Sequence, residues 1–176
     1  MRRSQFAKLV GLSEEALNLL RARKHVPLRG RPIGPGWKEL FGEDAVAMEA
    51  AAALARCGVK KNDAREWVDL YFKEGLDRAA EQRGRRGQRQ PIYLGVVTSV
   101  GIADGMPVED DHFPLVGTAS EVAEELERIG EMLGGDRWLN GAITINLNLC
   151  AKLVSIRAHA NGIVDEQLSQ LEGILC

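Results

Sequence analysis

Apolar residues recur at helical spacing in the first part of the chain. Phe6, Leu9 and Val10 predict a short helix over residues 4–10, and Gly11 provides a turn after it. Ser13 is the expected N-cap of a second helix that extends to about residue 24. Four apolar residues form the core stripe expected for that helix: Ala16, Leu17, Leu19 and Leu20. Two short helices joined by a glycine turn are what a helix-turn-helix requires.

The composition changes in the next segment. Residues 26–38 contain three prolines and three glycines, which excludes a helix and favours a hairpin-like loop. An alanine-rich helix is predicted over about 43–57, with Cys57 in the core and Gly58 as its C-terminal stop. A fourth helix is predicted to extend to about Gln82, although Gly75 weakens it.

The second half alternates between strand and helix patterns. Residues 92–100 are rich in β-branched side chains and predict a strand, which is followed by an acidic loop that extends to Pro114. A helix is expected from Ser120 to about 133, and alternating polarity over 142–147 predicts a second strand. The period of Leu149, Leu153 and Ile156 predicts another helix, and a last short helix is expected near 165–175.

The charge distribution divides the chain at about residue 90. Residues 1–90 carry 19 Lys and Arg against 12 Asp and Glu, whereas residues 91–176 carry 4 against 13. The stretch 83–91 is basic, polar and glycine-bearing, which is typical of a linker. We therefore expect a basic domain over 1–82, a linker over 83–91 and an acidic oligomerisation or effector domain over 92–176. The expected fold class is α+β, with an all-helical winged helix-turn-helix domain followed by a small β-α-β-α domain.

The first 75 residues also resemble a known family in the order of their motifs. Phe6-Ala7-Lys8-Leu9 and Gly11-Leu12-Ser13 fill the first helix and turn, and Leu17 takes the buried aliphatic place. Leu40-Phe41 stand near the aromatic position that precedes the third helix, and Gly58-Val59 begin the step to the fourth. In these features residues 4–75 resemble the MerR-type winged helix-turn-helix DNA-binding domain. The sequence departs from the family pattern at Asn18, at Leu19-Leu20 and at Lys24, where the family has arginine, an aromatic pair and glycine.

The resemblance implies binding to double-stranded DNA, with the second helix in the major groove and a basic wing on the backbone. The candidate DNA-binding residues on the second helix are Ser13, Glu15, Asn18 and Arg21. Those on the wing are Arg29, Arg31 and Lys38, and Arg2 and Arg3 form a flexible basic arm. The family also implies dimerisation through a C-terminal coiled coil. The linker interrupts the chain at that point, so we assign homodimerisation to residues 92–176.

Other chemistry has little support in the sequence. The three histidines and three cysteines lack metal-ligand or disulfide spacing, and no phosphate-binding glycine loop or nucleophile–base arrangement occurs. We expect no cofactor, no metal and no enzymatic activity. No apolar run is long enough for a membrane span, and the N-terminus lacks the apolar stretch of a signal peptide, so we expect a cytoplasmic protein.

The function expected from these features is sequence-specific regulation of transcription. Two alternatives stay open. The first is that the chain is the DNA-recognition component of a phage or mobile-element machine, such as an excisionase-like factor or a packaging subunit. The second is that it is a protein-interaction module that does not bind DNA. Oligomeric state separates a dimeric regulator from a ring-forming packaging subunit, and steep salt dependence separates DNA binding from protein binding.

Overall fold

The structure is a computed structural model that describes residues 1–23, 32–34, 37–38, 40–83, 89–103, 106–133 and 137–175. Within these ranges, only the backbone is described for 32–34, 37–38, 83, 103 and 107–110. The first half contains α1 (Arg3–Leu9), α2 (Glu14–Ala22), β1 (Pro32–Gly34), β2 (Trp37–Lys38), α3 (Gly42–Arg56) and α4 (Lys61–Arg83). The second half contains β3 (Tyr93–Ala103), β4 (Met106–Gly117), α5 (Ala119–Leu133), β5 (Trp138–Asn146), α6 (Leu147–Ala160) and α7 (Glu166–Leu175). The expected α+β class is confirmed.

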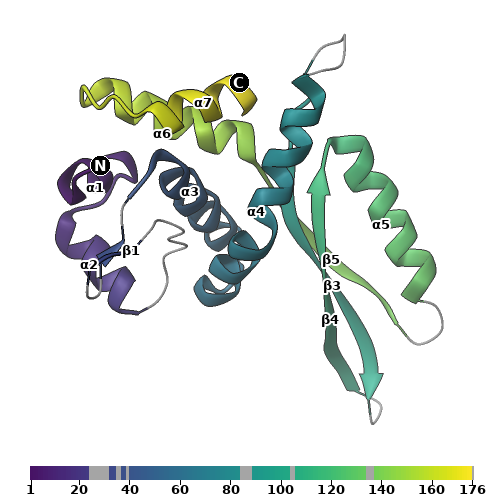
Figure 1. The fold of residues 1–176 in the computed structure, drawn as a ribbon. Coiled ribbons are helices and arrows are strands. Elements are labelled where there is room, and N and C mark those ends of the chain that lie inside the picture. Colours follow the sequence, from purple (N-terminus) through teal and green to yellow (C-terminus); the bar gives the residue numbers. More distant parts are fainter. Residues whose placement is uncertain are drawn as a thin grey trace.

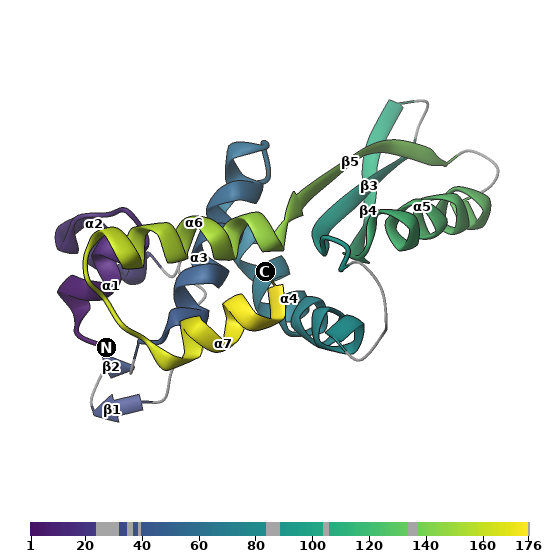
Figure 2. The ribbon, with the colours of Figure 1, turned by 90° about the horizontal axis from the view of Figure 1, so that it is seen from above.

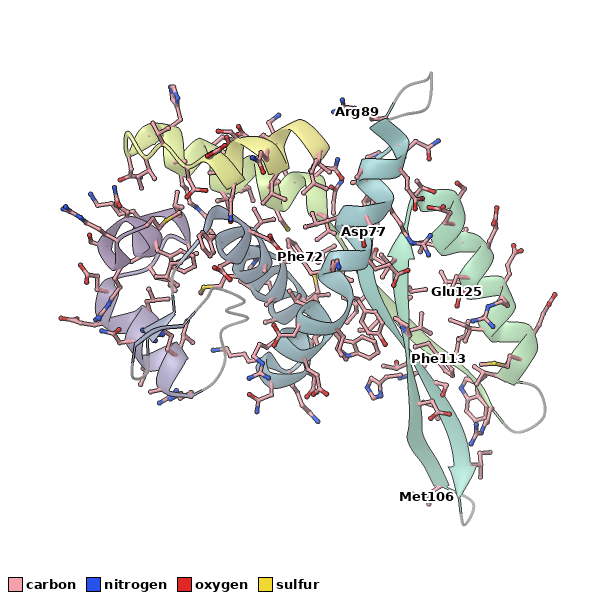
Figure 3. The ribbon with its side chains drawn as sticks, viewed as in Figure 1. Phe72, Asp77, Arg89, Met106, Phe113 and Glu125 are labelled. Atoms are coloured by element: carbon pink, nitrogen blue, oxygen red, sulfur yellow. The ribbon has the colours of Figure 1, made fainter. Side chains whose placement is uncertain are left out.

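The molecule has two ends of different architecture. Helices α1 and α2 lie at one end, and the sheet with α5 lies at the other, with α4 between them (Figure 1). A second view places α6 over α1 and α3, on the side of the molecule away from α5 (Figure 2). Figure 3 shows Met106 at the far tip of the β3–β4 hairpin, where its side chain is exposed.

The sheet is antiparallel, with strand order β4-β3-β5. Because side chains alternate along a strand, Val97 and Leu115 face α5, whereas Leu94 and Val116 face the larger helical core. The acidic loop expected up to Pro114 is wrong, since this segment is strand β4. Its composition disfavours a strand, but β4 lies at an edge of the sheet, where Pro114 pairs with Val96 without interrupting a central ladder.

The change in charge at about residue 90 does not coincide with a boundary in the hydrophobic core. One buried cluster includes Phe6 and Leu17 from the first half together with Val154 and Leu171 from the second. Helices α6 and α7 thus complete the core of the N-terminal helices, and the expected packing of 92–176 as a separate unit is wrong for these two helices. Arg89, near the end of the expected linker, also contacts α7, because its Nη1 donates to the carbonyl of Gly173 at 3.0 Å. Residues 84–88 lie outside the described residues.

Asp165 holds α7 against the start of α3. Its Oδ1 accepts the backbone N–H of Leu168 at 2.9 Å, which caps α7, and the N–H of Gly42 at 3.2 Å. A Cβ on Gly42 would come within 2.6 Å of the Leu168 Cβ and 2.7 Å of Asp165 Oδ1. The close approach of α3 and α7 therefore requires glycine at position 42.

Gly75 in α4 has a similar explanation. A Cβ there would lie 2.6 Å from Leu147 Cδ1 and within 3.8 Å of Ile92 and Val116. Gly75 lowers the helix propensity of this segment, and it is also the point at which α4 packs against the sheet and the start of α6. The cost in helix propensity is offset by this close packing.

The apolar residues whose spacing predicts α6 do not form the face of the helix that packs in the core. Leu149 and Ile156 are each 54% exposed, whereas Cys150, Ala151 and Val154 are buried. The helix therefore presents an apolar stripe to solvent on the side opposite its core contacts. Cys57 also differs from expectation, because α3 ends at Arg56 and the cysteine lies exposed in the turn after it. Gly58 adopts a φ of 103° and ends the helix as predicted.

Candidate nucleic-acid interface

The α1–α2 unit has the tight turn that its sequence predicts. Gly11 adopts the left-handed conformation, with φ of 68°, and the N–H of Leu12 donates back to the Ala7 carbonyl at 2.9 Å. Ser13 caps α2 by accepting the backbone N–H of Ala16 on its Oγ at 3.1 Å. The predicted cap is confirmed, and Ser13 contributes to the structure of the turn whether or not it contacts a ligand.

Helix α2 is anchored by one side of its surface only. Leu17 is fully buried and Leu20 is half-buried, so these two residues fix the helix to the core. Leu19 is 51% exposed, and its expected place in the core stripe is wrong because α2 meets the core through Leu17 and Leu20 on another side of the helix. The residues at positions 15, 18, 19 and 22 share one exposed face: Glu15, Asn18, Leu19 and Ala22.

Arg3 and Asn18 meet across the two helices. Arg3 Nη1 donates to Asn18 Oδ1 at 3.3 Å, in an exposed position. Arg3 is the first residue of α1, and the N-terminal amine of Met1 donates to the Leu40 carbonyl at 2.7 Å. The expectation of a flexible arm at Arg2 and Arg3 is therefore wrong, since these residues are held at the start of a helix. Arg3 instead adds a cation to the edge of the exposed face of α2.

The segment expected to be a wing contains a short antiparallel pair of strands. β1 pairs with β2, with Pro32 opposite Lys38 and Gly34 opposite Trp37. Arg29 and Arg31 lie outside the described residues, and Lys38 is described only as part of the β2 backbone. Of the four candidates on α2 and at its N-cap, Arg21 is half-buried in the last turn of the helix, and the other three are exposed.

Charge is distributed unequally between the two ends of the molecule. Residues 1–23 carry five Lys and Arg against two Glu. Ten of the thirteen acidic residues of the second half fall between 104 and 136, in the β3–β4 hairpin, α5 and the segment after it. Glu125 belongs to α5, at the opposite end of the molecule from α1 and α2 (Figure 3). A polyanion would therefore be attracted to the α1–α2 end and repelled by the sheet end.

A buried ion-pair network lies behind the α1–α2 turn. Glu49 of α3 is 4% exposed and accepts from Arg56 at 2.8 Å and from Arg157 of α6 at 2.6 Å. Arg157 Nη1 also lies 3.4 Å from the Leu9 carbonyl at the end of α1. No motif in the sequence marks Arg157 for this role. Its one signal was that it is among the four cations of an otherwise acidic half.

No group of three or more His, Cys, Asp or Glu in the described part of the chain is placed to hold a metal ion. None of the described helices has the length and apolar character that a membrane span requires. Comparisons of the chain with protein-family models, curated proteins and solved structures found no match.

Proposed function

We propose that the chain binds double-stranded DNA through a winged helix-turn-helix formed by residues 4–75, and that it is a sequence-specific regulator of transcription. In this proposal α2 enters the major groove and the segment around β1 and β2 lies on the DNA backbone as a wing. The proposal follows the MerR-type resemblance of the sequence.

One observation carries this proposal. Helix α2 follows a glycine turn, is anchored through Leu17, and leaves the face of Glu15 and Asn18 uncovered. Asn side chains donate and accept at once, which suits them to the edge of adenine in the major groove. The cations at the α1–α2 end supply the sequence-independent part of the affinity by releasing counterions from phosphate.

A protein-interaction module is the second candidate, because Leu19 is 51% exposed in the middle of this face. An exposed leucine beside Asn18 would fit the thymine methyl group in a groove, but it would fit an apolar pocket of a partner protein equally well. The charge of the α1–α2 end favours DNA over an uncharged protein partner. Salt dependence separates the two, since only a phosphate-binding surface loses affinity steeply as salt rises.

The function of the DNA-bound protein depends on its oligomeric state. A regulator of this kind acts as a dimer, whereas the DNA-recognition component of a packaging machine forms a ring. We assign dimerisation to the second half, where the exposed Leu149 and Ile156 of α6 form an apolar stripe. In this arrangement each copy would present its α1–α2 unit to one half-site.

Selection of fragments from genomic DNA by the full-length protein tests the proposal most directly. We expect enrichment of a short sequence motif, with an affinity that falls steeply between low and physiological salt. Binding without an enriched motif would refute the sequence-specific regulator and leave the machine component. Failure to bind any DNA at low salt would refute both and leave the protein-interaction module.

A further inference from the structure

A cavity of about 470 Å³ lies between the α1–α2 turn, α3 and α6. The elements that bound it can be followed in Figure 2, where α6 crosses over α1 and α3. Much of its wall is apolar, and these lining residues come from three elements: Val10, Leu12, Leu20, Met48, Ala52 and Ala55. The volume lies within the range of small-molecule sites, and the wall is formed by helices that pack through a shared core.

The polar part of the wall carries a surplus of positive charge. Arg56, Lys61 and Arg157 line the cavity, and Glu49 is the acidic residue among the lining side chains described. Glu49 is buried and binds both arginines, so it balances one of the three positive charges. Lys61, at the first position of α4, forms no ion pair with the described residues and is exposed at the cavity. Two positive charges therefore remain for a ligand to neutralise.

We propose that this cavity binds a small organic anion with an apolar body, such as an aromatic or branched carboxylate or sulfonate. The apolar part of the ligand lies against Leu12, Leu20 and Met48, and the anionic group lies toward Lys61 and the free N–H groups of Arg56. A neutral compound of the same shape leaves the surplus charge unbalanced, and an inorganic anion leaves the apolar wall uncovered. The site thus selects for both features together.

The binding proposal does not depend on DNA binding, because it is measured on the free protein. Two fluorescent probes that differ in one group provide the measurement. 1-Anilinonaphthalene-8-sulfonate carries the anionic group, and N-phenyl-1-naphthylamine is the same ring system without it. We expect the full-length protein to bind the sulfonate at one saturable site and to bind the neutral probe at least about threefold more weakly, which is the size of one exposed charge interaction.

Two variants with matched controls locate the site. Lys61→Gln removes a charge without touching the Glu49 network, and Lys73→Gln removes an equivalent exposed charge from α4 at a position that does not line the cavity. We expect Lys61→Gln to weaken sulfonate binding about threefold and to leave the neutral probe unchanged, whereas Lys73→Gln changes neither.

Ala52→Leu narrows the cavity at an exposed helical position that tolerates leucine, and Ala80→Leu adds the same side chain to α4 away from it. We expect Ala52→Leu to weaken both probes by about tenfold, and Ala80→Leu to have no effect. Circular dichroism establishes that each variant is folded. Sulfonate affinity that is unchanged in Lys61→Gln, or that is equal in Ala52→Leu and Ala80→Leu, would overturn the proposal and place the probe on an exposed apolar surface instead.

Discussion

Arg157 Nη1 lies 2.6 Å from Glu49 Oε2, and this contact joins α6 to α3 across 108 positions of sequence. The other carboxylate oxygen of Glu49 accepts from Arg56, and Arg157 also approaches the carbonyl at the end of α1. The buried carboxylate is therefore paired on both oxygens, and the cation lies where the negative end of the α1 dipole favours it. The position of the α1–α2 turn thus depends on a residue from the second half of the chain.

Replacing Arg157 with alanine should destabilise the whole protein. The substitution leaves the buried Glu49 carboxylate with Arg56, an exposed side chain, as its remaining partner. Breaking a buried pair in this way costs about 3 kcal/mol. Urea unfolding followed by circular dichroism measures the loss as a lower midpoint. Arg128→Ala is the matched control, since Arg128 pairs with Glu125 on the exposed surface of α5 and its removal should leave the midpoint unchanged. Equal midpoints for the two variants would show that the Glu49–Arg157 pair does not hold the two halves together.

Local patterns in the sequence predicted most of the elements of this fold. The spacing of Phe6 and Leu9, the cap at Ser13 and the stop at Gly58 depend on contacts within one turn of a helix, so they are readable without knowing the rest of the chain. The expected glycine turn between the first two helices is found at Gly11 for the same reason. The expectation that Asn18 lies on the exposed face of α2 also follows from helical period alone.

What the sequence did not predict depends on partners distant in the chain. β4 is a strand because β3 pairs with it along its length, although its own acidic residues disfavour a strand. The apolar period of α6 indicated a helix, but not which face is buried, because its other face carries the smaller residues Cys150 and Ala151 that fit against α3. Gly75 reads as a weak point in its helix, and Gly42 carries no signal in the sequence, until the segments that approach them are known.

Gly42→Ala is expected to destabilise the protein by about 1–3 kcal/mol. The added Cβ would overlap with Leu168 Cβ, which is attached directly to the backbone, and with Asp165 Oδ1, which is held by hydrogen bonds from the N–H groups of Gly42 and Leu168. Thermal unfolding measures the effect. Gly141→Ala serves as the control, because no atom lies within 4 Å of a Cβ at that exposed position of β5. A Gly42→Ala protein as stable as the Gly141→Ala protein would mean that α7 does not pack closely on the start of α3.

The stabilising effect of Cys150 should decline at alkaline pH. Burial, and then the nearby Glu49 carboxylate, raise the pKa of the Cys150 thiol from 9.0 to about 12. Because the folded-state pKa is the higher one, the neutral thiol stabilises the fold fully below pH 9.0, and this contribution is lost as pH rises toward about 12. The difference in unfolding free energy between wild type and Cys150→Ala should fall by about 1.4 kcal/mol per pH unit in that range. Urea titrations at about pH 8 and about pH 10.5 measure it, and a difference that does not change with pH would contradict the prediction.

Substitutions on the proposed DNA interface should separate affinity from sequence preference. Changing Arg29 and Arg31 together to alanine removes two cations of the expected wing, so binding should weaken alike for all sequences and the salt slope should fall by about two. Changing Asn18 to alanine should alter which bases are preferred, because this side chain lies on the exposed face of α2. Fluorescence anisotropy with the selected fragment and with scrambled DNA measures both effects. A uniform loss of affinity for Asn18→Ala would assign this residue to the backbone and not to base readout.

The exposed apolar stripe of α6, formed by Leu149 and Ile156, is the proposed dimer interface. If the exposed stripe of α6 is the dimer interface, the full-length chain should have a mass of twice 19.3 kDa in sedimentation equilibrium. Changing Leu149 and Ile156 together to glutamine should yield a folded monomer, because both side chains are 54% exposed in the single chain and their loss opens no cavity in the core. Met106→Gln, which removes an exposed apolar side chain from the tip of the hairpin, should leave the dimer intact. A wild-type monomer would refute dimerisation outright. A double variant that still dimerises would move the interface from α6 to another surface, with the open edges of β4 and β5 as the next to test.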